Sequence, residues 1–216
     1  MDELRGYPLR RESIVVGGRT YELIMPADSN ALLDDARVAA RFARDEYMPY
    51  WATLWPAARV LADVVATWEP VDSADAPQVL ELGGGIGLVG LVAAARGYRV
   101  TISDYDEDAL AFAAANAQRN KLPPPATRYV DWRETYADLR PERILAADVL
   151  YEKRHLEPIA RFVRQHLSPT GFALISDAHR STADDFCDVA RACELTVEIT
   201  QHQQGRVFRL AHATTR

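Results

Sequence analysis

The spacing of apolar residues changes several times along the chain, and each change marks an expected element. Within residues 12–25, two strand-like runs flank the pair Gly17-Gly18, which is typical of a tight β-hairpin. Apolar positions three and four apart then predict a helix over residues 29–45. A second amphipathic helix is predicted from Pro56 to residue 68, because proline suits the first turn of a helix.

From residue 79 onward, short apolar runs alternate with helical stretches. Strands are predicted over residues 79–82, 99–103, 127–130, 143–150, 172–176, 195–200 and 206–211. Helices are predicted over residues 87–95, 106–120, 154–167 and 182–193. This alternation indicates an α/β fold, a doubly wound and mostly parallel seven-stranded sheet with helices on both faces. The segment before the last strand is too short for a parallel crossover, so that strand is expected to be antiparallel.

A glycine-rich loop, Gly83 to Gly87, stands where the first strand of this sheet becomes a helix. Glycines at such a turn let the backbone come close to a ligand. Gly85, Gly87 and Gly90 also satisfy the GxGxxG pattern, and Asp104 ends the next strand where a ribose-binding acid belongs. The glycines alone therefore leave a nicotinamide dinucleotide site open.

Acidic residues around this loop favour a cationic ligand. Glu81 lies two residues before the first glycine, where a carboxylate would face the loop and would be unfavourable beside a pyrophosphate. The run from Asp104 to Asp108 contains no basic residue that would hold phosphates. S-adenosylmethionine carries both an ammonium and a sulfonium, so the acids favour it as the cofactor.

The sequence ELGGGIG (residues 81–87), followed by SDYD (residues 103–106), resembles motif I and the post-I acid of the class I S-adenosylmethionine-dependent methyltransferases. That family has a Rossmann-like seven-stranded sheet whose last strand is antiparallel. The resemblance implies a cofactor site, and we expect it to include Glu81, Gly83, Gly85, Gly87, Asp104 and Tyr105.

A second group of residues is expected to face the glycine loop. In a doubly wound sheet the strand order reverses beside the first strand, so the strands over residues 79–82 and 143–150 should flank one crevice. Asp148 and Tyr151 fall at its edge, and Ala147 precedes them. The segment ADVLY resembles the DxxY signature of the seven-strand protein lysine methyltransferases.

Two tryptophan-containing segments support the same branch. YWATLWP (residues 50–56) resembles a pocket-lining segment of the electron-transfer flavoprotein and elongation-factor lysine methyltransferases, which implies that Trp55 contacts the cofactor or substrate. Trp51 is expected either in the pocket or as a hydrophobic plug. Asp131 and Trp132 resemble the turn that contacts adenine in that family.

These residues predict transfer of a methyl group to a lysine amine of a protein. Methyl transfer depends mainly on alignment, so Asp148 is expected to orient the amine, and Tyr151 to shape the slot. The same residues are compatible with a small-molecule amine or heterocycle as acceptor, as in the nicotinamide-type N-methyltransferases. A binding module without turnover and a nicotinamide-dependent dehydrogenase are the other candidates. A helix-capping Asp148 and a half-buried Tyr151 would be the purely structural interpretation.

Composition and net charge limit the kinds of binding partner that the chain is expected to have. The 216 residues are 48% hydrophobic, which fits one compact unit. The family resemblance implies a methyltransferase domain over residues 47–216, preceded by an extension over residues 1–46. The net charge of −6 argues against duplex nucleic acid or an anionic membrane as the main partner. No hydrophobic leader or membrane span is evident, and both cysteines are expected to be reduced, so we expect a cytoplasmic monomer or weak oligomer without a metal site.

Overall fold

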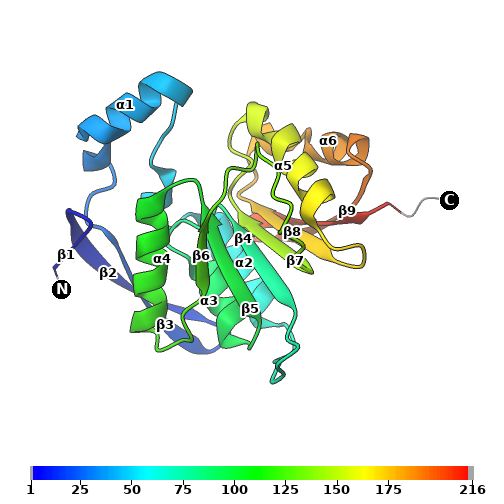
Figure 1. The fold of residues 1–216 in the computed structure, drawn as a ribbon, viewed down its shortest axis with the longest axis horizontal. Coiled ribbons are helices and arrows are strands. Elements are labelled where there is room, and N and C mark those ends of the chain that lie inside the picture. The colour runs from blue at the N-terminus through cyan, green and yellow to red at the C-terminus, as the bar shows by residue number, and fades with distance from the viewer. Residues whose placement is uncertain (1, 214–216) are drawn as a thin grey trace.

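A computed structural model describes residues 2–213, which form two sheets and their flanking helices (Figure 1). The larger sheet has the strand order β6-β5-β4-β7-β8-β10-β9. Its strands are β4 (Gln78–Leu82), β5 (Arg99–Asp104), β6 (Ala126–Tyr129), β7 (Arg143–Ala147), β8 (Phe172–Asp177), β9 (Leu195–His202) and β10 (Gly205–His212). All seven strands lie where the sequence predicts them, with ends that differ by a few residues.

The topology confirms the predicted doubly wound sheet. The strands from β4 to β8 pair in parallel, whereas β10 runs antiparallel to both of its neighbours, β8 and β9. The strand order reverses beside β4, which pairs with β5 on one side and with β7 on the other. The carboxyl ends of β4 and β7 are therefore adjacent, as a ligand crevice at this reversal requires.

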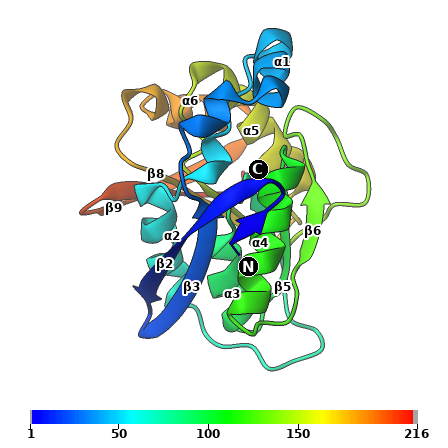
Figure 2. The same ribbon diagram turned by 90° about the vertical axis from the view of Figure 1, so that its left-hand side faces the viewer.

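Helices cover both faces of the larger sheet. They are α2 (Pro56–Ala66), α3 (Leu88–Ala95), α4 (Glu107–Arg119), α5 (Lys153–His166) and α6 (Phe186–Ala192), whereas α1 (Ala36–Asp45) stands away from the sheet (Figures 1 and 2). Because successive strand residues point to opposite faces, Val79 of β4 packs in the cluster that contains α2, α3 and α4, whereas Leu80 packs in the cluster that contains α5 and α6. The two faces thus carry separate hydrophobic cores.

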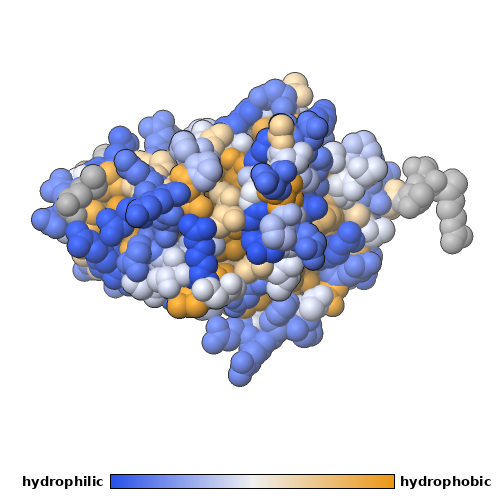
Figure 3. Space-filling view, turned by 90° about the horizontal axis from the view of Figure 1, so that it is seen from below, coloured by the Kyte–Doolittle hydropathy of each residue, from blue (hydrophilic) through white to orange (hydrophobic). Residues whose placement is uncertain are grey.

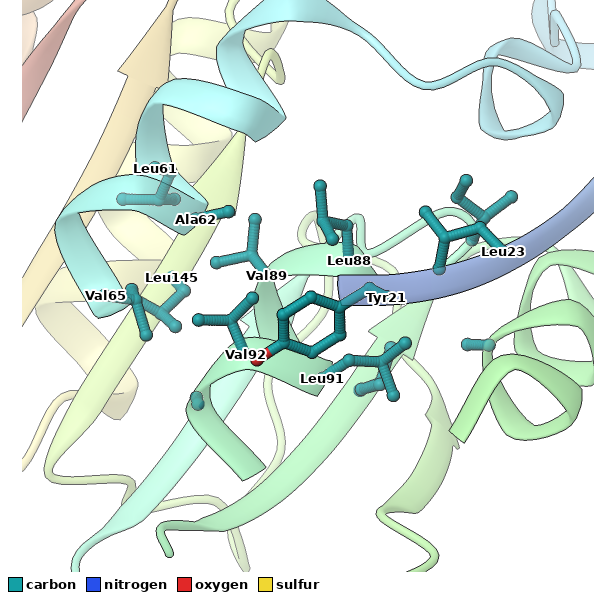
Figure 4. Packing of buried hydrophobic residues seen from close by; sticks show 14 of the residues in the cluster. Tyr21, Leu23, Leu61, Ala62, Val65, Leu88, Val89, Leu91, Val92 and Leu145 are labelled. Carbon is teal, nitrogen blue, oxygen red and sulfur yellow. The ribbon is translucent and has the colours of Figure 1, made fainter. Parts of the chain in front are cut away.

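The smaller sheet precedes the larger one in the chain and shares its core. It consists of β1 (Glu3–Leu4), β2 (Tyr7–Val16) and β3 (Arg19–Pro26), with the predicted turn at Gly17 and Gly18, both at positive φ. Figure 2 shows these strands, in blue, beside α3 and α4. In Figure 4, Tyr21 and Leu23 of β3 lie on one side of α3, and Leu61 of α2 lies on the other. The hairpin therefore closes one face of the main core.

Asn116 of α4 joins the hairpin to the glycine loop. Its Oδ1 accepts the backbone N–H of Ile24 (2.7 Å), and its Nδ2 donates to the carbonyls of Ile24 (3.1 Å) and Ile86 (3.0 Å). The side chain is fully buried, so these backbone groups have no exposed alternative. The position of the loop is thereby linked to the position of β3.

Three predicted elements differ from the observed ones. The helix expected over residues 29–45 is divided into a short 3-10 turn (Ala31–Asp34) and α1, because Asp35 is extended. The helix expected over residues 182–193 is likewise divided into a 3-10 turn (Ser181–Ala183) and α6. A further 3-10 turn spans Tyr50–Ala52, and β1 was not predicted.

The third difference bears on the site. The strand expected over residues 143–150 ends at Ala147, because Asp148 adopts a left-handed conformation with φ of 58° and turns the chain out of the sheet.

Hydrophilic and apolar side chains are mixed on the surface that Figure 3 presents. Within residues 2–213, no helix has both the length and the apolar character needed to cross a membrane.

Candidate active site

The conformation of the loop between β4 and α3 favours glycine at its centre. Gly85 has a left-handed φ of 54°, and a Cβ atom added there would lie 3.2 Å from the carbonyl oxygen of Trp51. The N–H of Gly85 donates to Oδ2 of Asp104 (2.8 Å). The loop is therefore held between the end of β5 and the segment that precedes α2.

Asp104 and Glu81 are buried carboxylates that hold this loop. Asp104 accepts the N–H groups of Gly85 and Asp106, and burial, with the Asp106 charge adding to it, raises its pKa to about 7. Oε2 of Glu81 accepts the N–H of Gly90 (2.9 Å), and burial raises the pKa of Glu81 to about 8, with the Asp104 charge acting in the same direction. Both acids can therefore ionise near neutral pH when a cation approaches.

A cavity of about 300 Å³ opens at the carboxyl ends of β4 and β7. This volume is at the lower end of the range for small-molecule sites, which is roughly 300–1,000 Å³. Eleven of the twelve predicted site residues line it: Trp55, Glu81, Gly83, Gly85, Asp104, Tyr105, Asp131, Trp132, Ala147, Asp148 and Tyr151. Segments from five parts of the chain therefore meet in one cavity.

Gly87 is the exception, and its contact with the cofactor stays a prediction. It does not line the cavity but begins α3, with a left-handed φ of 88°. A Cβ atom there would lie 2.9 Å from Cβ of Ala113 in α4. This glycine therefore allows α3 and α4 to pack closely, which is a structural role.

Aromatic rings form a row along the mouth of the cavity. The ring of Tyr50 packs edge-on against Trp55 (6.0 Å between centroids) and against Tyr151 (5.0 Å). His155 continues the row, because its ring lies 4.9 Å from that of Tyr151 and 5.3 Å from that of Trp132. The row gives the cavity an apolar wall with polar edges.

Trp51 has both of the predicted features. Its ring is buried against Tyr7 and Phe112, and its Nε1 donates to the hydroxyl of Tyr47. Its residue also borders the cavity, where its carbonyl faces Gly85. The ring is therefore a hydrophobic plug behind the cavity.

The turn after β6 presents an ion pair to the cavity. The Arg133 guanidinium donates two hydrogen bonds to the Asp131 carboxylate, from Nε to Oδ1 (2.8 Å) and from Nη2 to Oδ2 (2.7 Å). Burial by itself raises the pKa of Asp131, but the Arg133 guanidinium lowers the pKa below its ordinary value. The Asp131 side chain is therefore ionised and already bound, while Trp132 covers Gly83.

Asp148 and Tyr151 lie opposite the glycine loop, as the crevice argument predicts. Both oxygens of Asp148 are engaged by Arg180, with Nε to Oδ1 at 2.7 Å and Nη2 to Oδ2 at 3.2 Å. Burial raises the pKa of the Tyr151 phenol, so this hydroxyl stays protonated and can donate a hydrogen bond.

Arg180 and His155 line the cavity, and the sequence analysis did not select them. His155 lies only four residues after Tyr151, in the first turn of α5, and this nearness in sequence could have indicated it. No comparable signal marks Arg180, because the carboxylate that it binds is 32 residues away in the sequence.

Residues 43–189 match a protein family described as "Lysine methyltransferase". Curated relatives include "Histone-arginine methyltransferase METTL23" of Mus musculus, 31% identical over 147 residues, which are 65% of this chain and 55% of the relative. "Protein N-lysine methyltransferase METTL21A" of Danio rerio is 37% identical over 126 residues, 54% of this chain and 55% of the relative. The chain thus spans about half the length of these relatives.

Solved structures share the fold at low sequence identity. A TehB-like S-adenosylmethionine-dependent methyltransferase from Corynebacterium glutamicum aligns with a TM-score of 0.56 and 16% identity, over 87% of this chain and all of that one. The glycopeptide N-methyltransferase MtfA, solved with S-adenosylmethionine, aligns with a TM-score of 0.58 and 16% identity, over 73% of this chain and 94% of that one.

Proposed function

Because this chain belongs to the lysine methyltransferase family, whose members use S-adenosylmethionine, we propose that it transfers a methyl group from this cofactor to the side-chain amine of a lysine in a protein. One observation carries the proposal. A single cavity holds the glycine loop with its buried acids on one wall, and Asp148 and Tyr151 on the other.

The residues of the loop fit the cofactor. Asp104 and Glu81 supply negative charge for a ligand that carries an ammonium and a sulfonium, and the backbone of Gly85 lines the cavity beside them. Trp132 offers an aromatic face for the adenine ring. When bound, the cofactor would supply a methyl group activated by its positively charged sulfur. After transfer of the methyl group, the rest of the cofactor is a neutral thioether.

The opposite wall is suited to holding an amine. The aromatic row of Tyr50, Trp55 and Tyr151 encloses an aliphatic chain and excludes water. Asp148 orients the amine by accepting its N–H groups, and the Tyr151 hydroxyl donates at the edge of the slot. The chain thus positions the acceptor and does not form a covalent bond to it.

Radiolabel transfer tests this function. We expect purified protein to bind S-adenosylmethionine by calorimetry and to move its tritiated methyl group onto lysine residues of lysate proteins, identified by mass spectrometry. Asp148→Ala is expected to lower methyl transfer at least tenfold while it changes cofactor affinity less than threefold. The matched control is Asp138→Ala, because the exposed Asp138 pairs with Arg128 at the surface, away from the cavity.

The outcomes separate the candidates. Tritium on arginine residues would show that the acceptor is a guanidinium and not a lysine amine. Tritium confined to small molecules would favour a small-molecule amine as the acceptor. Absence of a binding signal with S-adenosylmethionine would overturn the proposal as a whole.

A further inference from the structure

Asp148 lies in a turn that is fixed independently of any ligand. Its left-handed backbone follows β7 directly, and its N–H donates to the carbonyl of Ser176 on β8 (2.9 Å). Its side chain is only 1% exposed, whereas that of Asp131 across the cavity is 14% exposed. Solvent therefore screens the charge of Asp148 very little.

The carboxylate of Asp148 is already paired with a cation of the protein, the Arg180 guanidinium. Arg180 binds both oxygens of Asp148, the two-pronged geometry in which a guanidinium matches a carboxylate best. The Arg180 guanidinium also lies 5.5 Å from the ring centroid of Trp55, so it forms part of the wall of the slot. Any acceptor that reaches Asp148 meets Arg180 as well.

The backbone that carries Arg180 is held at both its N–H and its carbonyl. The N–H donates to the buried carboxylate of Asp177 (3.0 Å), and the carbonyl accepts Nη2 of Arg206 (2.9 Å). Nε of Arg206 donates to the same Asp177 (3.1 Å), and the hydroxyl of Thr182 donates to the carbonyl of Leu150 (2.8 Å). These contacts fix the loop to β10 and to the DxxY turn, so the ion pair is a constructed part of the cavity.

The charges of this pair cancel inside the slot. A buried carboxylate without its partner carries a large energetic penalty, which a second cation would relieve. An unpaired Asp148 would therefore bind an ammonium strongly. With Arg180 in place, each carboxylate oxygen accepts one N–H of the guanidinium and keeps a second lone pair for another N–H.

We propose that Arg180 is a specificity-determining residue of the acceptor slot: its guanidinium cancels the charge of Asp148, so that the slot takes the acceptor amine in its uncharged form. This inference rests on the proposed methyl transfer to nitrogen.

The reason lies in the chemistry of the acceptor. Lysine is cationic at neutral pH, since its reference pKa is about 10.4, and an ammonium has no lone pair to offer to a methyl group. A lone carboxylate would hold the proton on the amine, whereas a neighbouring cation favours its loss to bulk water before the amine enters the slot. Arg180 thus offsets the effect of Asp148 on the proton, while Asp148 can still orient the neutral amine by hydrogen bonding.

Two cofactor analogues report this charge balance without an acceptor. S-adenosylhomocysteine has a neutral sulfur, whereas sinefungin carries an amine where the cofactor carries the transferable methyl group. Calorimetry gives the dissociation constant of each analogue. The constant for S-adenosylhomocysteine divided by the constant for sinefungin measures how well the slot accepts a cation. We expect Arg180→Gln to raise this ratio at least tenfold and Asp148→Asn to lower it at least tenfold.

Further variants separate charge from shape. Arg180→Lys keeps the positive charge and is expected to stay within threefold of the wild-type ratio, as is the double variant Arg180→Gln/Asp148→Asn. Arg164→Gln is the matched control, because Arg164 pairs with Glu194 on the surface of α5 and does not line the cavity.

The outcomes decide between the two proposals. Equal ratios in wild type and Arg180→Gln would overturn the role of Arg180 while leaving methyl transfer intact. If Arg180→Gln fails to fold, an unchanged ratio in Asp148→Asn would overturn it instead. If the wild type binds neither analogue, the proposed function falls and this inference falls with it.

Discussion

Replacement of Asp104 by Asn tests whether the glycine loop is held by an acid whose ionisation is suppressed. The ordinary pKa of an aspartate in an unfolded chain is about 3.9, whereas burial raises the pKa of Asp104 in the folded protein to about 7. The folded state therefore keeps a proton that the unfolded state has lost. This group contributes stability below pH 4 that is lost progressively as the pH rises towards 7.

The size of the effect follows from the shift. One pKa unit corresponds to about 1.4 kcal/mol, so a shift of roughly three units corresponds to about 4 kcal/mol between pH 4 and pH 7. The amide introduced by Asp104→Asn cannot titrate, so the free energy of unfolding of wild type minus that of the variant should fall by about 1.4 kcal/mol for each pH unit in this range. The comparison with wild type is needed because other groups also titrate in this range. Burial lowers the pKa of His166, so the contribution of His166 to the free energy of unfolding is lost as the pH falls, opposite to that of Asp104.

Urea denaturation of the ligand-free protein at pH 5, 6 and 7 measures this difference. Asp138→Asn is the control: Asp138 is exposed, and the hydrogen bond from Arg128 lowers its pKa, so its difference from wild type should stay constant over these pH values. A difference for Asp104→Asn that does not change with pH would refute the reasoning, because it would show that Asp104 is ionised in the free protein.

Two further predictions concern the supports of the loop. Gly85→Ala should cost about 1–2 kcal/mol in urea denaturation, because a left-handed φ is unfavourable for alanine, and should weaken S-adenosylmethionine binding at least tenfold by calorimetry. Unchanged affinity would show that the ligand does not contact this backbone. Asn116→Leu should cost about 3 kcal/mol or more, since buried backbone groups of Ile24 and Ile86 lose their partners. A loss in urea denaturation below about 1 kcal/mol would mean that those groups find other partners.

The parts of the site that the sequence predicts are those whose chemistry is local. The loop from Gly83 to Gly87 joins a strand to the following helix, and Asp104 ends the next strand, so both are recognisable from short segments. Asp148 and Tyr151 were placed opposite the loop by a general rule of doubly wound sheets, which needs only the order of the strands.

The end of β7 shows why hydrophobicity alone misplaces a boundary. Val149 and Leu150 continue the apolar run of the strand, and both are buried in the cluster beneath α5. Their burial is the same whether they belong to a strand or to a turn that packs on the core. The left-handed backbone of Asp148, which ends β7, has no counterpart in the apolar pattern.

Long-range ion pairs are the other part that could not be predicted. Arg180 is one of many arginines in the chain, and nothing near it in the sequence identifies Asp148 as its partner. Similarly, Gly87 fits a ligand-binding motif, yet its lack of a side chain serves the contact of α3 with Ala113. Only the folded arrangement distinguishes these roles.

The position of β10 between β8 and β9 imposes an order on assembly. During synthesis β9 emerges first, yet it has no neighbour in the sheet until β10 has been made and inserted. Because Arg206 belongs to β10, the acceptor side of the cleft acquires its anchor only at that stage. The strands that carry the donor side, β4 and β5, are complete roughly a hundred residues earlier. A nascent chain thus gains the parts that we propose to hold the methyl donor well before those that we propose to receive a target.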